Sequence, residues 1–248
     1  YTFTRTFGIE IEACGIAPTT LAAELTAAGI ECRAEGYNHT TRPHWKVVSD
    51  GSVCGDRPFE LVSPVLAGEE GLAQVKTVCG VLNRLGAQVN KTCGLHVHFG
   101  VGELEHEPKF WRNLLNNYAD LEPSIDAVMP PSRRGNRNAF CRPVAHPQLR
   151  ERLARCHDLR AIERVATNGC RYHKVNISSF WRHRTVEFRH HSGTTDFAKI
   201  SNWVSMLSRL VEFSRHSKVV EHAFEGIREF ATADIHAFYT ERRLRLAA

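Results

Sequence analysis

Histidines and carboxylates occupy every second position in four short segments of the sequence that are otherwise apolar. Side chains on a β-strand alternate between its two faces, so each segment would present polar residues on one face and apolar residues on the other. The segments are "GIEIEA", "FELVS", "GLHVHFG" and "TVEFRHH". Their polar residues, in chain order, are Glu10 and Glu12, Glu60, His96 and His98, and Glu187 with Arg189.

Any one of these segments could be a strand with a solvated outer face. Together, however, they offer several carboxylates and an imidazole, which are ligands that suit hard divalent cations such as Mg²⁺ or Mn²⁺. Arg189 would share the face of Glu187 and could bind phosphate oxygens through two hydrogen bonds. Carboxylates, a metal and an arginine on one sheet face indicate phosphoryl transfer from a nucleotide.

The usual sequence signatures of nucleotide binding are missing. The chain contains no GxxxxGK[ST] loop and no glycine loop of the protein-kinase type. A nucleotide would therefore have to be bound by another fold.

The composition is that of a globular protein. At 248 residues, with 42% hydrophobic and 24% charged residues, the chain can form one large domain or two small ones with a buried core. The formal net charge of +5 is too small to indicate nucleic-acid binding by itself. Arginines are concentrated between Arg133 and Arg189, which suits a polyanionic ligand at least as well as it suits DNA.

The cysteine spacing and the length of the apolar runs indicate in which cellular compartment the protein is expected. Eight cysteines are widely spaced, without a CxxC pair or zinc-finger spacing, which predicts reduced thiols. No apolar run approaches the roughly 18 residues that a membrane-spanning helix needs. No signal peptide is visible, although the chain begins at Tyr1 without Met, so an upstream segment could have been removed. We expect a cytoplasmic protein with no membrane partner.

The sequence between these segments predicts the elements that position them. Alternating patterns predict strands over residues 5–13, 44–53, 57–65, 90–100, 172–180 and 184–191, with a turn at Asp50-Gly51. Helical periodicity predicts helices over 19–30, 68–87, 107–129, 148–166 and 196–217, followed by a helical tail. Residues 130–147 are rich in Pro, Arg and Asn and predict a loop. This order favours an α+β fold with a mainly antiparallel sheet.

Six motifs in this order resemble the amidoligase family, a distant relative of glutamine synthetases and γ-glutamylcysteine ligases. They are "FGIEIE", "SDGSV", "FELVSP", "GLHVHFG", "RYHKVN" and "TVEFRHHSGT", and the resemblance runs from about Arg5 to about Ser214. It implies a single catalytic domain over residues 1–248, with the core motifs in about 5–214 and a helical C-terminal extension. It also implies a curved, mainly antiparallel sheet of the glutamine synthetase type, flanked by helices.

The resemblance implies a role for each polar residue. Asp50 would orient or deprotonate an incoming amine, and Glu187 and Arg189 would act in catalysis, the arginine as a phosphate clamp. The implied metal ligands are Glu10, Glu12, Glu60, His96 and Glu187. The implied nucleotide or substrate contacts are His98, Arg171, Lys174, Asn176, Arg189 and Arg133, with Arg134 as an alternative to Arg133.

The activity implied by the resemblance is an ATP- and Mg²⁺- or Mn²⁺-dependent ligase that joins a carboxylate to an amine through an acyl phosphate. Its partners would be a carboxylate-bearing amino acid or peptide and an amine, and a homo-oligomer is compatible with it. Two alternatives stay open from the residues alone. One is a metalloenzyme that uses His96, His98 and a carboxylate without ATP. The other is a basic nucleic-acid-binding module that uses the arginines of 133–189.

Overall fold

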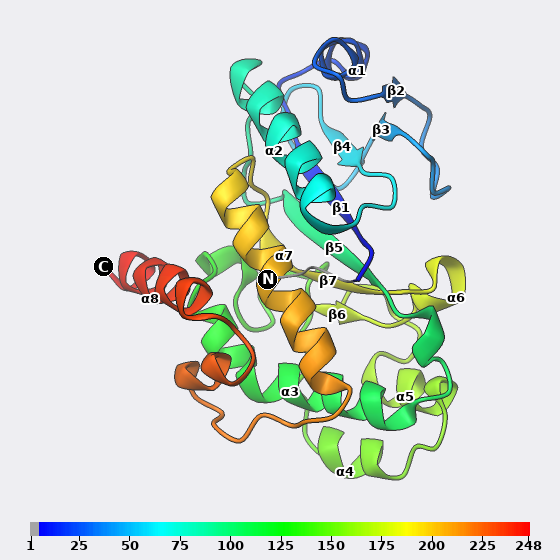
Figure 1. Ribbon diagram of the computed structural model, residues 1–248, viewed down its shortest axis with the longest axis vertical. Coiled ribbons are helices and arrows are strands. Elements are labelled where there is room, and N and C mark those ends of the chain that lie inside the picture. Colours follow the sequence, from blue (N-terminus) through cyan, green and yellow to red (C-terminus); the bar gives the residue numbers. More distant parts are fainter. Residues whose placement is uncertain (1–4) are drawn as a thin grey trace. The chain divides into compact units, whose positions relative to one another are not determined.

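The computed structural model describes residues 5–248, which divide into two compact units (Figure 1). The first unit extends to Phe99 and includes His191–Ser201, and the second comprises Gly100–His190 and Asn202–Ala248. The class is α+β with mainly antiparallel strand pairing, as the sequence predicts. Whether the units act as one catalytic domain over residues 1–248 stays a prediction.

The first unit contains five neighbouring strands and two helices. The strands follow the order β2-β3-β4-β1-β5, and only the β2–β3 pair is parallel among these described strands. The strands are β1 (Phe7–Ala13), β2 (Cys32–Ala34), β3 (Trp45–Val48), β4 (Phe59–Val62) and β5 (Gly94–Gly100), and the helices are α1 (Pro18–Ala27) and α2 (Gly68–Arg84).

One face of this sheet forms the core of the first unit. Ile9 and Ile11 of β1 are buried, as are Leu95 and Val97 of β5. Helix α2 lies close to this apolar side, because a Cβ atom at Gly71 would come within 3.0 Å of the Phe7 ring. Glycine at this position lets the helix approach β1, and the polar side chains of β1 are left on the opposite face.

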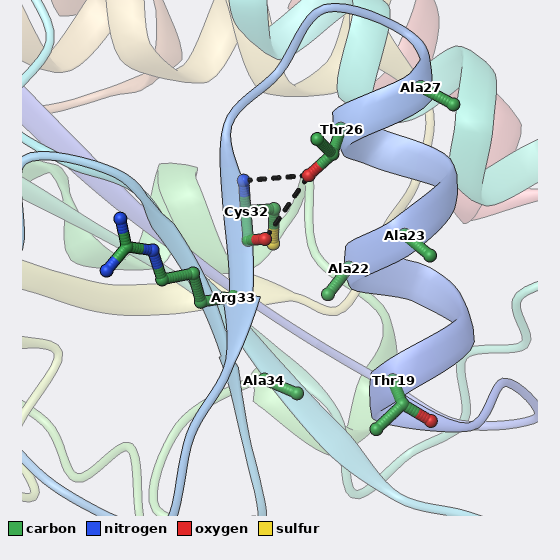
Figure 2. Close-up of a pocket in the computed structure, with 8 residues that line it drawn as sticks. All are labelled: Thr19, Ala22, Ala23, Thr26, Ala27, Cys32, Arg33 and Ala34. Atoms are coloured by element: carbon green, nitrogen blue, oxygen red, sulfur yellow. Dashed lines mark hydrogen bonds between the residues drawn. The ribbon is translucent and has the colours of Figure 1, made fainter.

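The edge strand β2, which the sequence patterns did not predict, is covered by a side chain of α1. The hydroxyl of Thr26 accepts a hydrogen bond from Cys32 N and donates one to Cys32 O, both at 3.3 Å (Figure 2). This hydroxyl therefore satisfies backbone groups that an edge strand would otherwise leave exposed. The depression beside it is lined mainly by alanine and threonine and holds no carboxylate or imidazole.

The second unit is mostly helical around the hairpin of β6 and β7. Its core contains fully buried aromatic rings, with Trp111 and Phe180 edge to face at 5.6 Å between centroids. The elements are η1 (Gly102–Leu104), α3 (Pro108–Asp126), η2 (Pro131–Arg133), α4 (Leu149–Ala154), α5 (Leu159–Ala166), β6 (Val175–Asn176), α6 (Phe180–His183), β7 (Thr185–Ser192), α7 (Phe197–Ser214), η3 (Phe224–Glu229) and α8 (Ala233–Ala247); β7 and α7 also include residues of the first unit.

Several predicted strands are shorter in the structure, including β3 and β4, and two predicted elements differ more strongly. The predicted helix 148–166 is divided into α4 and α5, because Asp158 caps α5 by accepting a hydrogen bond from Ala161 N at 2.7 Å. The predicted strand 172–180 is reduced to Val175–Asn176, since the chain turns after Asn176 and enters α6. All eight cysteines are free thiols.

Candidate active site

Strands β1, β4 and β5 carry four of the five predicted metal ligands, all but Glu187, on one face of the first unit's sheet. Glu12 of β1 lies directly opposite Glu60 of β4, and Glu10 of β1 lies directly opposite His96 of β5. Directly opposed residues of antiparallel strands point to the same side of a sheet. The pairing register therefore brings these four side chains together, as their alternating pattern predicts.

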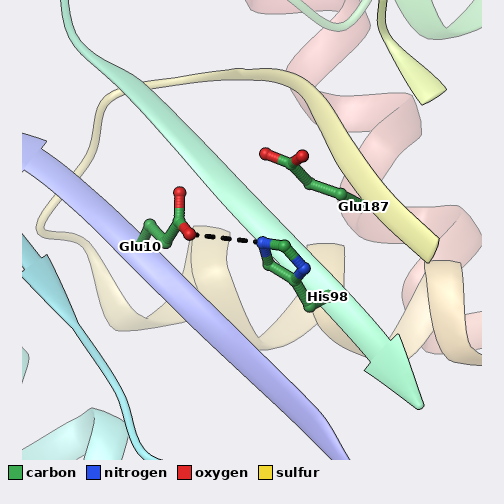
Figure 3. Close-up of side chains that lie close together, drawn as sticks. All are labelled: Glu10, His98 and Glu187. Carbon is green, nitrogen blue, oxygen red and sulfur yellow. Dashed lines mark ion pairs between the residues drawn. The ribbon is translucent and has the colours of Figure 1, made fainter. Parts of the chain in front are cut away.

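Glu10 contacts both histidines of β5, and Figure 3 shows its ion pair with His98. Its Oε2 lies 2.9 Å from His96 Nδ1, and its Oε1 lies 3.3 Å from His98 Nε2. Burial opposes ionisation of Glu10, yet hydrogen bonds with the two imidazoles and their charge hold the pKa of this carboxyl well below its usual range. Glu10 is therefore an ionised carboxylate that joins His96 to His98.

A second group of carboxylates surrounds Glu60. Ligand atoms of Glu12, Asp50 and Glu60 lie within 4.8 Å of one another, and so do those of Glu10, Glu60 and His96. Asp50 is fixed in the turn after β3, where its Oδ1 accepts hydrogen bonds of 2.7 Å from both N and Oγ of Ser52. The predicted turn thus places Asp50 beside two of the predicted metal ligands.

The electrostatics of this group suit a cation. The pKa of Glu60 is raised well above its usual range, first by burial and then by the negative charges of Glu10, Glu12 and Asp50. Carboxylates that repel one another in a buried place are stabilised by a positive charge between them. A donor set of several carboxylate oxygens with an imidazole is one that Mg²⁺ or Mn²⁺ accepts.

Lys46 is a buried residue of the same face that the sequence patterns did not indicate. It lies opposite Val62, which in turn lies opposite Glu10. Its Nζ donates to the carbonyl and side-chain oxygens of Asn38 and to Thr40 O, at 2.7–3.1 Å. Burial lowers the pKa of Lys46, while neighbouring carboxylates including Glu60 oppose that shift. The signal was available, because Lys46 is the one polar residue in the short apolar run "WKVV".

In the second unit, Glu187, Arg189 and Asn176 form one hydrogen-bonded group on β7 and β6. Glu187 lies opposite Asn176; its Oε2 accepts from Asn176 Nδ2 and its Oε1 from Arg189 Nη1, both at 2.6 Å. Arg189 Nε also donates to Phe140 O at 3.3 Å. Figure 3 labels Glu187 where it extends from β7. The alternation in "TVEFRHH" therefore gives a buried, charge-assisted pair.

The other predicted contacts of nucleotide or substrate differ in exposure. Arg171 is exposed, and its guanidinium lies 5.0 Å from the centroid of the Tyr172 ring. Arg133 is buried and donates to the backbone carbonyls of Arg189 and His190. Arg134 Nε donates to Met129 O at 2.7 Å. Arg133 and Arg134 therefore anchor the basic loop to β7 and to Met129.

Lys174 is fully buried and binds two carboxylates of α3 that the sequence analysis did not single out. Its Nζ lies 3.1 Å from Glu122 Oε1 and 2.8 Å from Asp126 Oδ1. The other oxygen of Glu122 accepts from the backbone N–H groups of Val144 and Ala145. A signal existed, since Tyr118, Glu122 and Asp126 are spaced at i, i+4 and i+8 and share a helix face with core residues.

The family of the chain follows from its sequence. Residues 4–211 match the family described as "Putative amidoligase enzyme". The chain belongs to the amidoligase family. This is a family of ligase-type enzymes, and the resemblance noted from the motifs is confirmed.

Individual proteins show only distant similarity to this chain. The amidoligase chain is similar to a solved structure titled "Crystal structure of novel glutamine synthase homolog", with 12% identity and a TM-score of 0.46. The similarity covers 98% of this chain and 65% of that one. No curated protein matches the amidoligase. Within residues 5–248, no helix is both long enough and apolar enough to cross a membrane.

Proposed function

We propose that this amidoligase is an ATP- and Mg²⁺-dependent ligase that joins a carboxylate to an amine through an acyl phosphate. The observation that carries the proposal is the group around Glu60, in which Glu10, Glu12 and His96 meet on one sheet face and Asp50 joins them from the turn after β3. A carboxylate is a poor electrophile, so amide formation needs an activating phosphoryl group, and a cation site supports transfer of that group.

The residues fit a divalent cation. Glu10, Glu12, Glu60 and His96 would hold it, and Asp50 is close enough to Glu12 and Glu60 to take part. A bound Mg²⁺ or Mn²⁺ would neutralise charge on the phosphates of ATP during transfer. For Glu187 in the second unit, the proposal keeps the role of metal ligand that the resemblance implies.

The reaction we propose has two steps. An oxygen of the substrate carboxylate attacks the γ-phosphorus of ATP, the bond to the β-phosphate oxygen breaks, and ADP leaves. The amine then attacks the acyl carbon, inorganic phosphate leaves, and the amine loses a proton. Arg189 would orient the transferring group, because Glu187 and Phe140 O hold its guanidinium in one position. Asp50 would accept the proton of the amine.

The donor set favours this proposal over a redox metalloenzyme. Sites for iron typically use two histidines and one carboxylate with open positions. Here both imidazoles contact the carboxylate of Glu10, and Glu60 lies close to Glu10 in one group and to Glu12 and Asp50 in another, so carboxylates outnumber imidazoles. An oxygen-rich set of this kind is more typical of Mg²⁺.

A nucleotide-binding and trapping experiment tests the proposal. Purified protein with MgCl₂ is titrated with ATP by calorimetry, and ADP release is followed with pooled amino acids and peptides. Hydroxylamine replaces the amine in a parallel reaction, since an acyl phosphate converts it to a hydroxamate. Glu10→Gln should lose ADP release, and Glu70→Gln, an exposed change on α2, should retain it. Absence of ATP binding in the wild-type protein would refute the proposal.

A further inference from the structure

Phe140 exposes a phenyl ring on a backbone that is held in place. The residue is 45% exposed, although it is large and apolar. Its N–H donates to Asn138 Oδ1 at 2.9 Å, and its carbonyl accepts from Arg189 Nε at 3.3 Å. A single exposed apolar residue is common on protein surfaces, so exposure alone assigns no role. The surroundings of the ring are what distinguish it.

Two arginines lie close to Tyr172, the aromatic neighbour of Phe140. The rings of Phe140 and Tyr172 are edge to face, with centroids 5.2 Å apart at 87°. The guanidinium carbons of Arg171 and Arg189 lie 5.0 Å and 5.6 Å from the centroid of the Tyr172 ring. Backbone hydrogen bonds between Arg142 and Tyr172 and between Lys174 and Arg142, both 2.8 Å, fix the two chain segments together. The aromatic pair is therefore preorganised beside two cations.

We propose that the exposed ring of Phe140, supported edge to face by Tyr172, is a stacking platform for the base of a nucleoside triphosphate, with Arg171 binding its phosphates. This inference rests on the proposed ATP dependence and names the side chains that recognise the base. An aromatic ring stacks on the π-face of any base, and a guanidinium matches phosphate oxygens through two hydrogen bonds. Arg189 connects the platform to the hydrogen-bonded group on β7 and β6, since it contacts Tyr172, Phe140 O and Glu187.

Two ligands separate base recognition from phosphate recognition. MgATP carries a base and a triphosphate, and magnesium tripolyphosphate carries the triphosphate alone. Calorimetry on the full chain should show that Phe140→Ala weakens MgATP binding roughly five- to a hundredfold and leaves tripolyphosphate binding unchanged. Arg171→Gln should weaken the binding of both ligands. Phe140→Trp, which keeps an aromatic face, should bind MgATP at least as tightly as the wild type.

A matched control is available in the first unit. Tyr37 is 58% exposed and lies edge to face with His39, so Tyr37→Ala also removes an exposed aromatic ring. This variant should bind both ligands normally, and circular dichroism should confirm that all variants are folded. The inference is overturned if Phe140→Ala binds MgATP like the wild type, or if it loses both ligands equally. If Phe140→Ala binds MgATP like the wild type, the proposed ligase function still stands. A wild-type protein that binds neither MgATP nor magnesium tripolyphosphate would contradict both the ligase function and the stacking platform.

Discussion

Glu12 and Glu60 lie directly opposite each other on the antiparallel strands β1 and β4. Like charges in this position destabilise a strand pair, and here they add to the negative charges of Glu10 and Asp50. Glu12 is compensated in part, because its Oε2 accepts a hydrogen bond from Gly94 N. The fold therefore tolerates a repulsive pair at the place where we propose a cation, which is expected of a functional site.

Glu60→Gln should raise the stability of the protein in the absence of divalent metal. The substitution replaces a carboxyl whose ionisation is opposed by burial and by neighbouring charges with a neutral side chain of the same size, and we expect a gain of about 0.5–1 kcal/mol in the free energy of unfolding. The same change should abolish stabilisation by added Mg²⁺ and the ATP-dependent activity. Chemical unfolding with EDTA and then with MgCl₂ measures the two effects on stability, and ADP release measures the activity. A variant that is less stable than the wild type under EDTA would contradict the repulsive interpretation.

The two histidines of β5 should respond differently to substitution. His96 lies within 4.8 Å of Glu10 and Glu60, whereas the contact of His98 is with Glu10 Oε1 at 3.3 Å. We expect His96→Asn to weaken Mn²⁺ binding by about 10- to 100-fold, since it removes a ligand or its immediate support. His98→Asn should affect ATP binding more than Mn²⁺ binding. Calorimetry with Mn²⁺ alone and then with ATP measures the affinity of each variant for each ligand. Equal effects of the two substitutions on both ligands would show that the two histidines have one role.

The candidate site of the first unit could be predicted because its signal is local. A period of two determines the face of each residue, so Glu10 with Glu12, and His96 with His98, are placed correctly by alternation. The pairing partners are not local. That Glu12 faces Glu60, and Glu10 faces His96, depends on a register that no short segment specifies.

Buried charges in the second unit show where sequence patterns fail. Lys174 follows a histidine in a polar stretch, and only its contacts with Glu122 and Asp126 show that it is fully enclosed. The loop 130–147 looks like a solvated basic turn, yet Glu122 and Asp126 accept hydrogen bonds from its backbone. The helical spacing of Glu122 and Asp126 is visible in the sequence, but their pairing with Lys174 is not, because that residue is far away in the sequence.

Glu122→Ala should be strongly destabilising. It leaves Lys174 with a single carboxylate partner, Asp126, and removes the acceptor of two loop N–H groups, so we expect a loss of about 2–4 kcal/mol. The exposed pair of Glu151 and Arg155 provides the control, and Glu151→Ala should cost less than about 0.5 kcal/mol. Urea unfolding measures the change in the free energy of unfolding for both variants. Because the penalty arises from the buried cation, combining Glu122→Leu with Lys174→Met should recover part of the loss.

His190 should make the protein less stable as the pH falls from about 6.5 to about 4. Burial, with the charges of Lys174 and Arg133, lowers the pKa of its ring from the ordinary 6.5 to about 4, although Asp126 opposes this shift. Between these values the unfolded chain binds a proton that the folded chain excludes, so the free energy of unfolding decreases with falling pH, by roughly 3 kcal/mol in total. The neutral ring fits its contacts: Nε2 donates to Asp126 Oδ1 at 2.7 Å, and Nδ1 accepts from Tyr118 Oη at 2.8 Å.

The contribution of His190 can be separated from those of the other histidines and of Asp126. The pKa of Asp126 is about 2, since hydrogen bonds from His190 and Lys174 outweigh the effect of its burial, so this carboxylate stays ionised down to pH 4. Urea unfolding of the wild type and of His190→Gln at pH 7, 6, 5 and 4, with EDTA present, isolates the ring. The variant lacks the titrating group, so its stability should fall less steeply over this range. Parallel curves for the two proteins would mean that the ring of His190 titrates in the folded protein as it does in the unfolded chain.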